Sequence, residues 1–112
     1  MSERFVYMTM ASVEQAQSIG RVLVEERLAA CVNVLAPMRS IYRWDGRIIE
    51  DTEVVLIAKS RDVLIDRLTA RVKELHSYTV PCVVALPIVQ GNADYLRWIR
   101  DETSGQGKLS EN

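Results

Sequence analysis

The sequence lacks the features that would place a protein in most specialised classes. Its 14 Lys and Arg residues face 15 Asp and Glu residues, so a net charge of −1 offers no basic surface for nucleic acid. No apolar run approaches the roughly 18 residues of a membrane span. The start, MSERFVYMTM, has no basic segment followed by an apolar one, so we expect no secretory signal, no membrane partner and a cytoplasmic location.

Residues of the reactive types are also few. The two cysteines, Cys31 and Cys82, lie in strand-like runs, and we interpret them as reduced thiols rather than as a disulfide. His76 is the single histidine, and no third group that would orient a Cys–His nucleophilic pair is evident. No glycine-rich stretch precedes a helix, as a phosphate-binding loop would require. We therefore expect no enzymatic activity.

What is present is the pattern of a small mixed domain. The 112 residues, 48% of them hydrophobic, predict one domain over residues 1–103 and a flexible C-terminal tail over 104–112. Apolar alternation and helical periodicity predict four strands and three helices. The predicted strands are 5–10, 30–44, 47–59 and 82–88, and the predicted helices are 13–28, 61–76 and a short one capped by Asn92.

Local signals mark the ends of these elements. Ser12 and Gln15 form a predicted capping box, and Ser60 is a predicted N-cap for the second helix. Gly20 lies on the apolar face of the first helix, where we expect it to allow close approach to the sheet. Asn33 follows the first helix in a tight junction, and we expect its amide to be buried.

The middle of the chain predicts a long β-hairpin. Asp45-Gly46 between two strand-like runs is typical of a two-residue type I′ turn. Pro37 has no N–H to donate, so it must lie on an edge strand or at a bulge. The polar residues 50–52 are a second predicted bulge or interruption.

The order of elements, βαββαβ plus a C-terminal helix, predicts an α+β ferredoxin-like sandwich with strand order 4-1-3-2 and both crossover helices on one face. One hairpin arm of 15 residues would span ~50 Å at ~3.3 Å per residue, farther than two short helices can cover. Apolar residues near its tip would stay exposed and invite pairing with another chain, so we expect an oligomer. They are Ile41, Tyr42, Trp44, Ile48 and Ile49.

Several motifs then occur in order and at matching intervals. They are LVEERLAACVN (23–33), SIYRWDG (40–46), Glu53, Lys59, HSYTVP (76–81) and LPIVQGNADYLRWI (86–99). Together they resemble the CutA family of divalent-cation tolerance proteins over about residues 5–103. The resemblance implies a PII-like fold, a tight homotrimer, a cytosolic location and a response to divalent metal ions, copper above all.

The resemblance also implies candidate metal ligands. Cys31 matches the cysteine of the family's AAC motif, and His76 and Tyr78 match its His-Pro-Tyr loop. Ser77 stands where the family usually has proline, and Cys82 stands where it usually has glutamate. The added thiol is a softer donor that suits Cu(I), so the candidate copper ligands are Cys31, His76 and Cys82. Met8, where some members have a cysteine, offers a thioether.

Each candidate has a structural alternative. Cys31 resembles a small buried hydrophobe, and His76 a helix C-terminal residue whose charge suits the helix dipole. Glu53, Lys59 and Tyr78 are candidates for a small-ligand clamp between subunits, or for simple ion pairing and solvated charge. Tyr42 and Trp44 are interface candidates that could instead line a ligand cleft. Three functions remain open: a metal-responsive trimer, a PII-like small-ligand sensor using inter-subunit clefts, and a scaffold with incidental metal binding.

Overall fold

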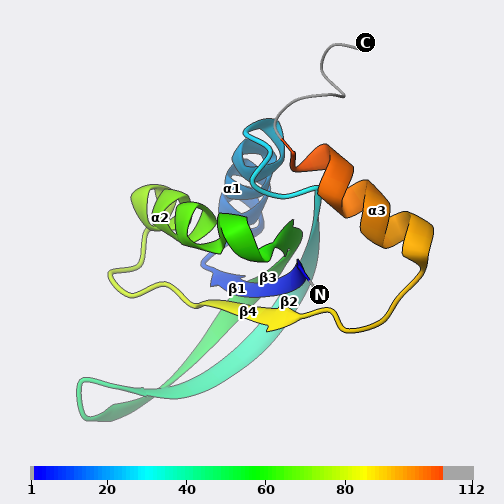
Figure 1. Cartoon of the computed structure of the whole chain (residues 1–112). Coiled ribbons are helices and arrows are strands. Elements are labelled where there is room, and N and C mark those ends of the chain that lie inside the picture. The colour runs from blue at the N-terminus through cyan, green and yellow to red at the C-terminus, as the bar shows by residue number, and fades with distance from the viewer. Residues whose placement is uncertain (1, 105–112) are drawn as a thin grey trace.

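The computed structural model describes residues 2–104, and its elements follow the predicted order (Figure 1). The strands are β1 (Glu3–Met10), β2 (Cys31–Trp44), β3 (Arg47–Arg61) and β4 (Val83–Pro87). The helices are α1 (Val13–Glu25), the short 3-10 helix η1 (Asp62–Leu64), α2 (Ile65–Leu75) and α3 (Ala93–Glu102). Within the described residues, no helix has the length and apolar character needed to cross a bilayer.

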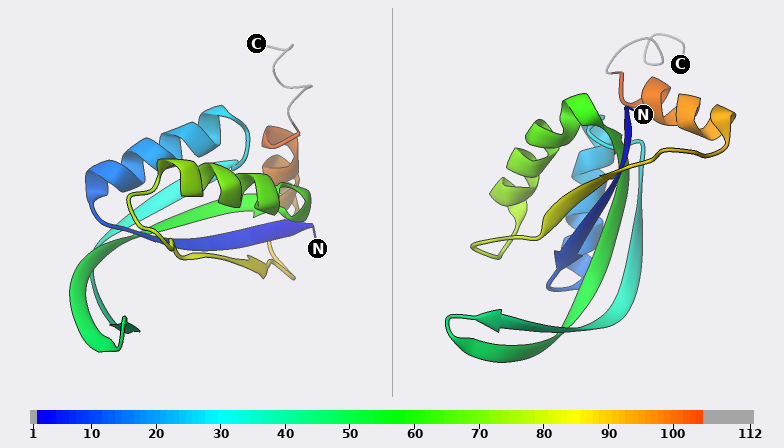
Figure 2. Two further views of the ribbon diagram at one scale, coloured as in Figure 1. Left: turned by 90° about the vertical axis from the view of Figure 1, so that its left-hand side faces the viewer. Right: turned by 60° about the horizontal axis from the view of Figure 1, so that its bottom comes forward.

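The strands form one sheet in the order β2-β3-β1-β4, and each strand is antiparallel to its neighbours. This is the predicted order read from the opposite edge, so the topology predicted from the sequence is confirmed. Helices α1 and α2 lie side by side over one face of the sheet (Figure 2). The fold is the predicted α+β arrangement.

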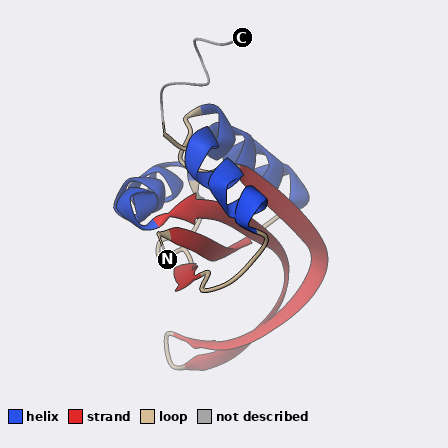
Figure 3. Ribbon diagram, turned by 45° about the vertical axis from the view of Figure 1, so that its right-hand side comes forward, coloured by secondary structure: helices blue, strands red, loops and turns tan. Residues whose placement is uncertain are grey.

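The hydrophobic core lies between these two helices and the sheet. Alternate residues of β1, Val6, Met8 and Met10, are fully buried and point toward the helices, as the two-residue period of a strand requires. Leu23 of α1 and Leu68 of α2 are equally buried against them. The other side chains of β1 therefore point to the opposite, open face, where the hairpin extends without a helix over its far half (Figure 3).

The β2–β3 hairpin gives the molecule its long axis. Asp45 and Gly46 have φ values of 53° and 77°, which confirms the predicted type I′ turn. The arms run well past the helices and curl, so the molecule measures 50 × 27 × 23 Å (Figure 2). Large apolar side chains on the hairpin remain exposed. They are Leu35, Ile41, Tyr42, Trp44 and Ile48.

The bulge predicted at residues 50–52 is wrong, because that stretch pairs regularly with residues 39–41. The register shift lies instead between Leu35 and Met38, where Pro37 cannot donate to the ladder. The prediction that Pro37 lies at an edge or a bulge is therefore confirmed on both counts, since β2 is an edge strand. One extra residue there changes which side chains of β2 face the open side of the sheet.

Two helix boundaries also differ from the predictions. Ser60 does not cap the second helix: it is a buried residue of β3, and its Oγ donates to the Leu28 carbonyl at 2.6 Å. The chain continues in extended form to Arg61 and enters α2 through η1. Helix α1 ends at Glu25 rather than at residue 28, because Arg27 takes a left-handed φ of 60°.

The remaining local predictions have mixed outcomes. Ser12 Oγ accepts from the Gln15 amide at 3.1 Å, but the Gln15 side chain accepts from Ala11, one residue before the expected partner. Asn92 caps α3 as predicted. Asn33 is exposed, so its predicted burial is wrong. Of the predicted tail, residues 105–112 lie outside the described part of the chain.

Gly20 packs against the sheet as predicted, and this packing is testable. A Cβ atom at Gly20 would lie 2.8 Å from Val32 Cγ2, and valine has little rotamer freedom with which to yield. Overpacking of this kind costs about 1–3 kcal/mol, more than the ~0.5–1 kcal/mol that alanine gains over glycine inside a helix. We expect Gly20→Ala to lower the free energy of unfolding measured by denaturant titration.

The control for this prediction is the same substitution beside a smaller neighbour. In a Val32→Ala background the clash is absent, so Gly20→Ala should raise the free energy of unfolding by about 0.5–1 kcal/mol. Equal effects of Gly20→Ala in both backgrounds would show that Gly20 is not there for close approach to Val32.

Candidate functional site

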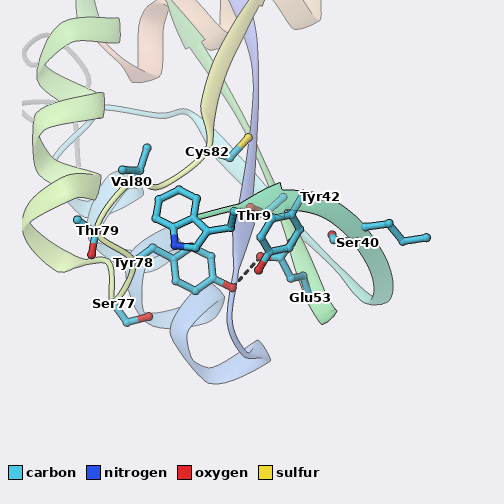
Figure 4. Close-up of a pocket in the computed structure, with 11 residues that line it drawn as sticks. Thr9, Ser40, Tyr42, Glu53, Ser77, Tyr78, Thr79, Val80 and Cys82 are labelled. Atoms are coloured by element: carbon cyan, nitrogen blue, oxygen red, sulfur yellow. Dashed lines mark hydrogen bonds between the residues drawn. The ribbon is translucent and has the colours of Figure 1, made fainter. Parts of the chain in front are cut away.

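A cavity of about 660 Å³ lies at the base of the hairpin (Figure 4). Its floor is the open face of the sheet, which contributes Thr9 and Glu53, together with Cys82 directly before β4. The hairpin supplies Tyr42 and Trp44 on another side. The loop after α2, residues 77–80, closes it. We call this the hairpin pocket.

The strand registers explain why these side chains converge. Val54 and Leu56 of β3 enter the core, so by alternation the side chain of Glu53 faces the open side. Beyond the register shift, β2 pairs Met38 with Glu53, Ser40 with Asp51 and Tyr42 with Ile49. Directly paired residues share a face, so the even-numbered residues of this arm face the same side as Glu53. Without the shift, Tyr42 and Trp44 would point to the other face.

A buried carboxylate lies at the centre of the pocket. Glu53 is only 6% exposed, and the Tyr78 hydroxyl donates to its Oε2 at 2.6 Å (Figure 4). Within residues 2–104, no lysine, arginine or histidine forms an ion pair with it. Burial and the bond to Glu53 together raise the pKa of Tyr78 well above the usual range of a phenol, so this hydroxyl is a permanent donor.

The neighbouring phenol and thiol are protonated and therefore neutral. The Tyr42 hydroxyl donates to Asp51 Oδ2 at 2.9 Å, and this bond raises the pKa of Tyr42. Burial, followed by the nearby Glu53 charge, raises the pKa of the Cys82 thiol, and a hydrogen bond with Thr9 only partly opposes the shift. Cys82 is therefore a protonated thiol at neutral pH. No basic side chain lines the pocket.

His76 lies next to the pocket but performs a structural task. It ends α2, its Nδ1 accepts from the Tyr78 amide at 3.0 Å, and its Nε2 lies 2.8 Å from the Thr9 carbonyl. Because Nδ1 accepts a backbone N–H, Nε2 carries the hydrogen and donates to Thr9. Both ring nitrogens are occupied, so His76 ties the loop to β1 and could bind a metal only by giving up one of these bonds.

The second cysteine lies in a separate cluster on the same face. Lys59 Nζ donates to Cys31 Sγ at 3.6 Å and to Asn33 Oδ1. The Tyr95 hydroxyl of α3 lies 3.5 Å from Cys31 Sγ, and this contact raises the pKa of Tyr95 to about 12. Cys31 is thus a half-buried thiol beside polar groups, and the expectation that it is a buried hydrophobe is wrong.

The structure does not bring the predicted site residues into one group. By register, Cys31 is level with Phe5 of β1 and Cys82 lies next to the level of Met8, so they are separated by roughly 10–13 Å along the strands. Lys59 is six residues from Glu53 on β3, about 20 Å away, so the two form no pair within one chain. Met8 points into the core, away from both thiols.

These placements test whether copper fits the residues present. Within residues 2–104, no three His, Cys, Asp or Glu side chains lie close enough together to hold a metal ion. The hairpin pocket combines one thiol, Cys82, with one carboxylate, Glu53. One chain therefore offers an incomplete donor set, and a metal held here would need further donors from another molecule.

Sequence reasoning missed several contributors to the pocket, namely Thr9 and the loop residues Thr79 and Val80. Pro37 was the available signal for the side chains of β2 that reach the pocket. It indicated a bulge, and the position of the bulge decides which aromatic residues face Glu53.

The Tyr78–Glu53 bond should be measurable as stability. Tyr78→Phe removes the donor and leaves a buried carboxylate unsatisfied, which costs about 1–3 kcal/mol in the free energy of unfolding. Adding Glu53→Gln removes the charge and should recover part of this loss in a double-mutant cycle. The matched control is Tyr42→Phe, which removes a hydroxyl from the exposed Asp51 and should cost under about 0.5 kcal/mol. If Tyr78→Phe costs no more than Tyr42→Phe, the buried bond contributes nothing.

Comparison with known proteins agrees with this architecture. Residues 4–102 match the model of a family described as CutA1 divalent ion tolerance protein. The divalent-cation tolerance protein CutA of Thermus thermophilus is 50% identical over 101 residues, which cover 90% of this chain and 98% of that protein. The human protein CutA is 44% identical over 97 residues, which cover 87% of this chain and 54% of the human protein.

Solved structures give the same result. The Thermus thermophilus structure, described as a divalent cation tolerance protein, has a TM-score of 0.88 at 50% identity over 90% of this chain and 98% of that one. The Archaeoglobus fulgidus structure, described as a periplasmic divalent cation tolerance protein CutA, has a TM-score of 0.87 at 40% identity over 90% and 98%. The chain belongs to the CutA1 family of divalent ion tolerance proteins.

Proposed function

We propose that this chain is a non-enzymatic, cytoplasmic homotrimer that responds to metal ions, and that copper binds in its hairpin pocket. The observation that carries the proposal is the pocket itself, in which a buried carboxylate without a counter-cation lies near a thiol. A site of that charge favours cations over anions. The names of its relatives, which refer to divalent-cation tolerance, support the same direction.

The donor set suggests how copper would bind. A thiolate suits Cu(I), and Cys82 is the thiol that lines the cavity. Glu53 would add negative charge beside it. Since one chain lacks a third donor, the remaining ligands would come from a neighbouring subunit. Cys31, beside Lys59, is the alternative thiol. Copper is the cargo of such a site, and the chain's own residues only bind it and shield it from water.

The trimer is supported by the exposed apolar surface of the hairpin. Ile41 is 68% exposed, Ile48 58% and Trp44 51%, on the far half of the hairpin, which no helix of the same chain covers. By register Trp44 lies on the open face and Ile41 and Ile48 on the opposite one, so both faces of the hairpin expose apolar side chains that another chain could cover. The two free cysteines support a reducing compartment, although the Archaeoglobus relative is described as periplasmic. Cell fractionation tests the location.

A second candidate is a small-ligand sensor. The cavity of about 660 Å³ lies within the range of roughly 300–1,000 Å³ typical of small-molecule sites, and a few polar groups converge in it among aromatic side chains. A thermal-shift screen against nucleotides and metabolites, beside one against metal ions, separates this function from the first.

We expect light scattering to give three times the chain mass of 12.7 kDa at micromolar concentration. Trp44→Asp places a charge among the exposed apolar side chains of the hairpin. It should therefore lower the mass of the assembly or make that mass depend on protein concentration. Val63→Asp is the matched control, because Val63 is 66% exposed, more than Trp44, but lies in η1, away from the hairpin. A monomeric parent protein would overturn the trimer, and equal effects of both substitutions would remove Trp44 from the interface.

Copper binding through Cys82 should depend on pH. Because the thiol pKa is raised, binding of Cu(I) must displace a proton, and the apparent Kd should fall about tenfold per pH unit between pH 6 and 8. The measurement is competition with a Cu(I) chelator whose own pH dependence is known. Cys82→Ser should abolish the pH slope and weaken binding at least about tenfold, ~1.4 kcal/mol.

Cys31→Ser is the control in this titration and should leave affinity and slope unchanged. If Cys31→Ser removes the slope and Cys82→Ser does not, copper binds at the Lys59 cluster instead. If neither substitution matters, thiol-based copper binding is wrong, and the small-ligand sensor becomes the better hypothesis.

A further inference from the structure

The buried carboxylate of the hairpin pocket also points to a ligand other than a metal ion. Glu53 is 94% withdrawn from solvent and receives one hydroxyl hydrogen bond, at Oε2, but no described residue forms an ion pair with it. Removing a carboxylate from water is costly unless a cation compensates it. The compensating charge is therefore expected from outside the chain.

The walls of the pocket indicate which kind of cation. Tyr42 and Tyr78 turn toward Glu53 from opposite elements, one from the hairpin and one from the loop (Figure 4). Both phenols are protonated donors to carboxylates, so their rings are neutral. The His76 ring packs against Tyr78 with the centroids 4.5 Å apart, and both Tyr42 and Tyr78 still line the cavity. Aromatic faces attract cations, and most strongly those that shed their water easily.

A small hard metal ion is a poor match to these walls. Magnesium and calcium require about six or more oxygen ligands, and the cavity offers one carboxylate and one thiol across about 660 Å³. A substituted ammonium ion needs no fixed coordination number. Its methyl groups pack on aromatic rings, its charge is diffuse, and its size suits an open cavity of this volume.

We propose that the hairpin pocket binds an organic cation of the substituted-ammonium class, with Glu53 as the counter-charge and the rings of Tyr42 and Tyr78 as its walls. This ligand is distinct from copper, and the inference does not depend on the metal function. Cys82 is not part of it, because a neutral thiol contributes little to a diffuse positive charge.

The test is an NMR titration of the ¹⁵N-labelled full-length protein with tetramethylammonium chloride, at constant ionic strength set by sodium chloride. The neutral control ligand is tert-butanol, which has a similar size and no charge. We expect tetramethylammonium to shift the amide signals of Glu53 and Tyr78 and to bind at least about tenfold more tightly than tert-butanol. Equal affinities would show an apolar hollow rather than a cation site and would overturn the proposal.

Four variants locate the interaction. Glu53→Gln should weaken tetramethylammonium binding about tenfold or more, whereas Glu25→Gln, the same change of charge on an exposed position of α1, should leave it unchanged. Tyr42→Leu should weaken binding, and Tyr42→Phe, which keeps the ring face, should match the parent protein. Unaltered affinity in Glu53→Gln, or equal losses in Tyr42→Leu and Tyr42→Phe, would overturn the assignment.

Failure of this proposal is distinguishable from failure of the metal proposal. Cys82→Ser should abolish the pH slope of Cu(I) binding while leaving tetramethylammonium affinity unchanged. Loss of tetramethylammonium binding in Cys82→Ser would make the thiol part of the organic-cation site and overturn the assignment to Glu53 and the two tyrosine rings.

Discussion

The register shift between Leu35 and Met38 is the constraint on which the rest of the site depends. A strand presents alternate side chains to opposite faces, so one extra residue reverses which side chains of the arm face the open side of the sheet. On the near side of the shift the residues facing that side are odd-numbered, and beyond it they are even-numbered. Tyr42 therefore joins Glu53 and Tyr78 around one cavity, although the three come from different elements.

The burial of Glu53 has a cost in free energy. The fold keeps Glu53 buried with a single hydroxyl donor, which is a costly arrangement for a side chain that a neutral residue of similar size could replace. His76 supports the arrangement at a distance, since its two ring nitrogens tie the start of the loop to β1 and to the Tyr78 amide. His76, one of the three candidate copper ligands, thus positions the phenol that meets the carboxylate.

The sequence allowed the sheet order, the helix faces and the hairpin turn to be predicted, because each depends on local periodicity or on a dipeptide with a known φ preference. It did not allow the position of the bulge to be predicted. Both Pro37 and residues 50–52 carried a bulge signal, and pairing across the hairpin decided between them. The same limit applies to the site. Glu53, Tyr78 and Cys82 were each identified as candidate site residues, but their position around one pocket depends on the strand register. Cys31 was misjudged because its neighbours, Lys59 and Tyr95, come from distant segments.

The same hairpin carries exposed apolar side chains and one wall of the pocket. Assembly and ligand binding, which a sequence does not connect, therefore depend on one element. An arm of a hairpin that no helix covers has little in its own chain to hold its curvature. Any surface that packs against Ile41 and Trp44 therefore also fixes the position of Tyr42 opposite Tyr78. A ligand held between those two rings would, by reciprocity, favour the hairpin conformation that the packing selects. A substitution of an exposed apolar residue on the hairpin is therefore expected to change ligand binding in the pocket even where that residue touches no ligand.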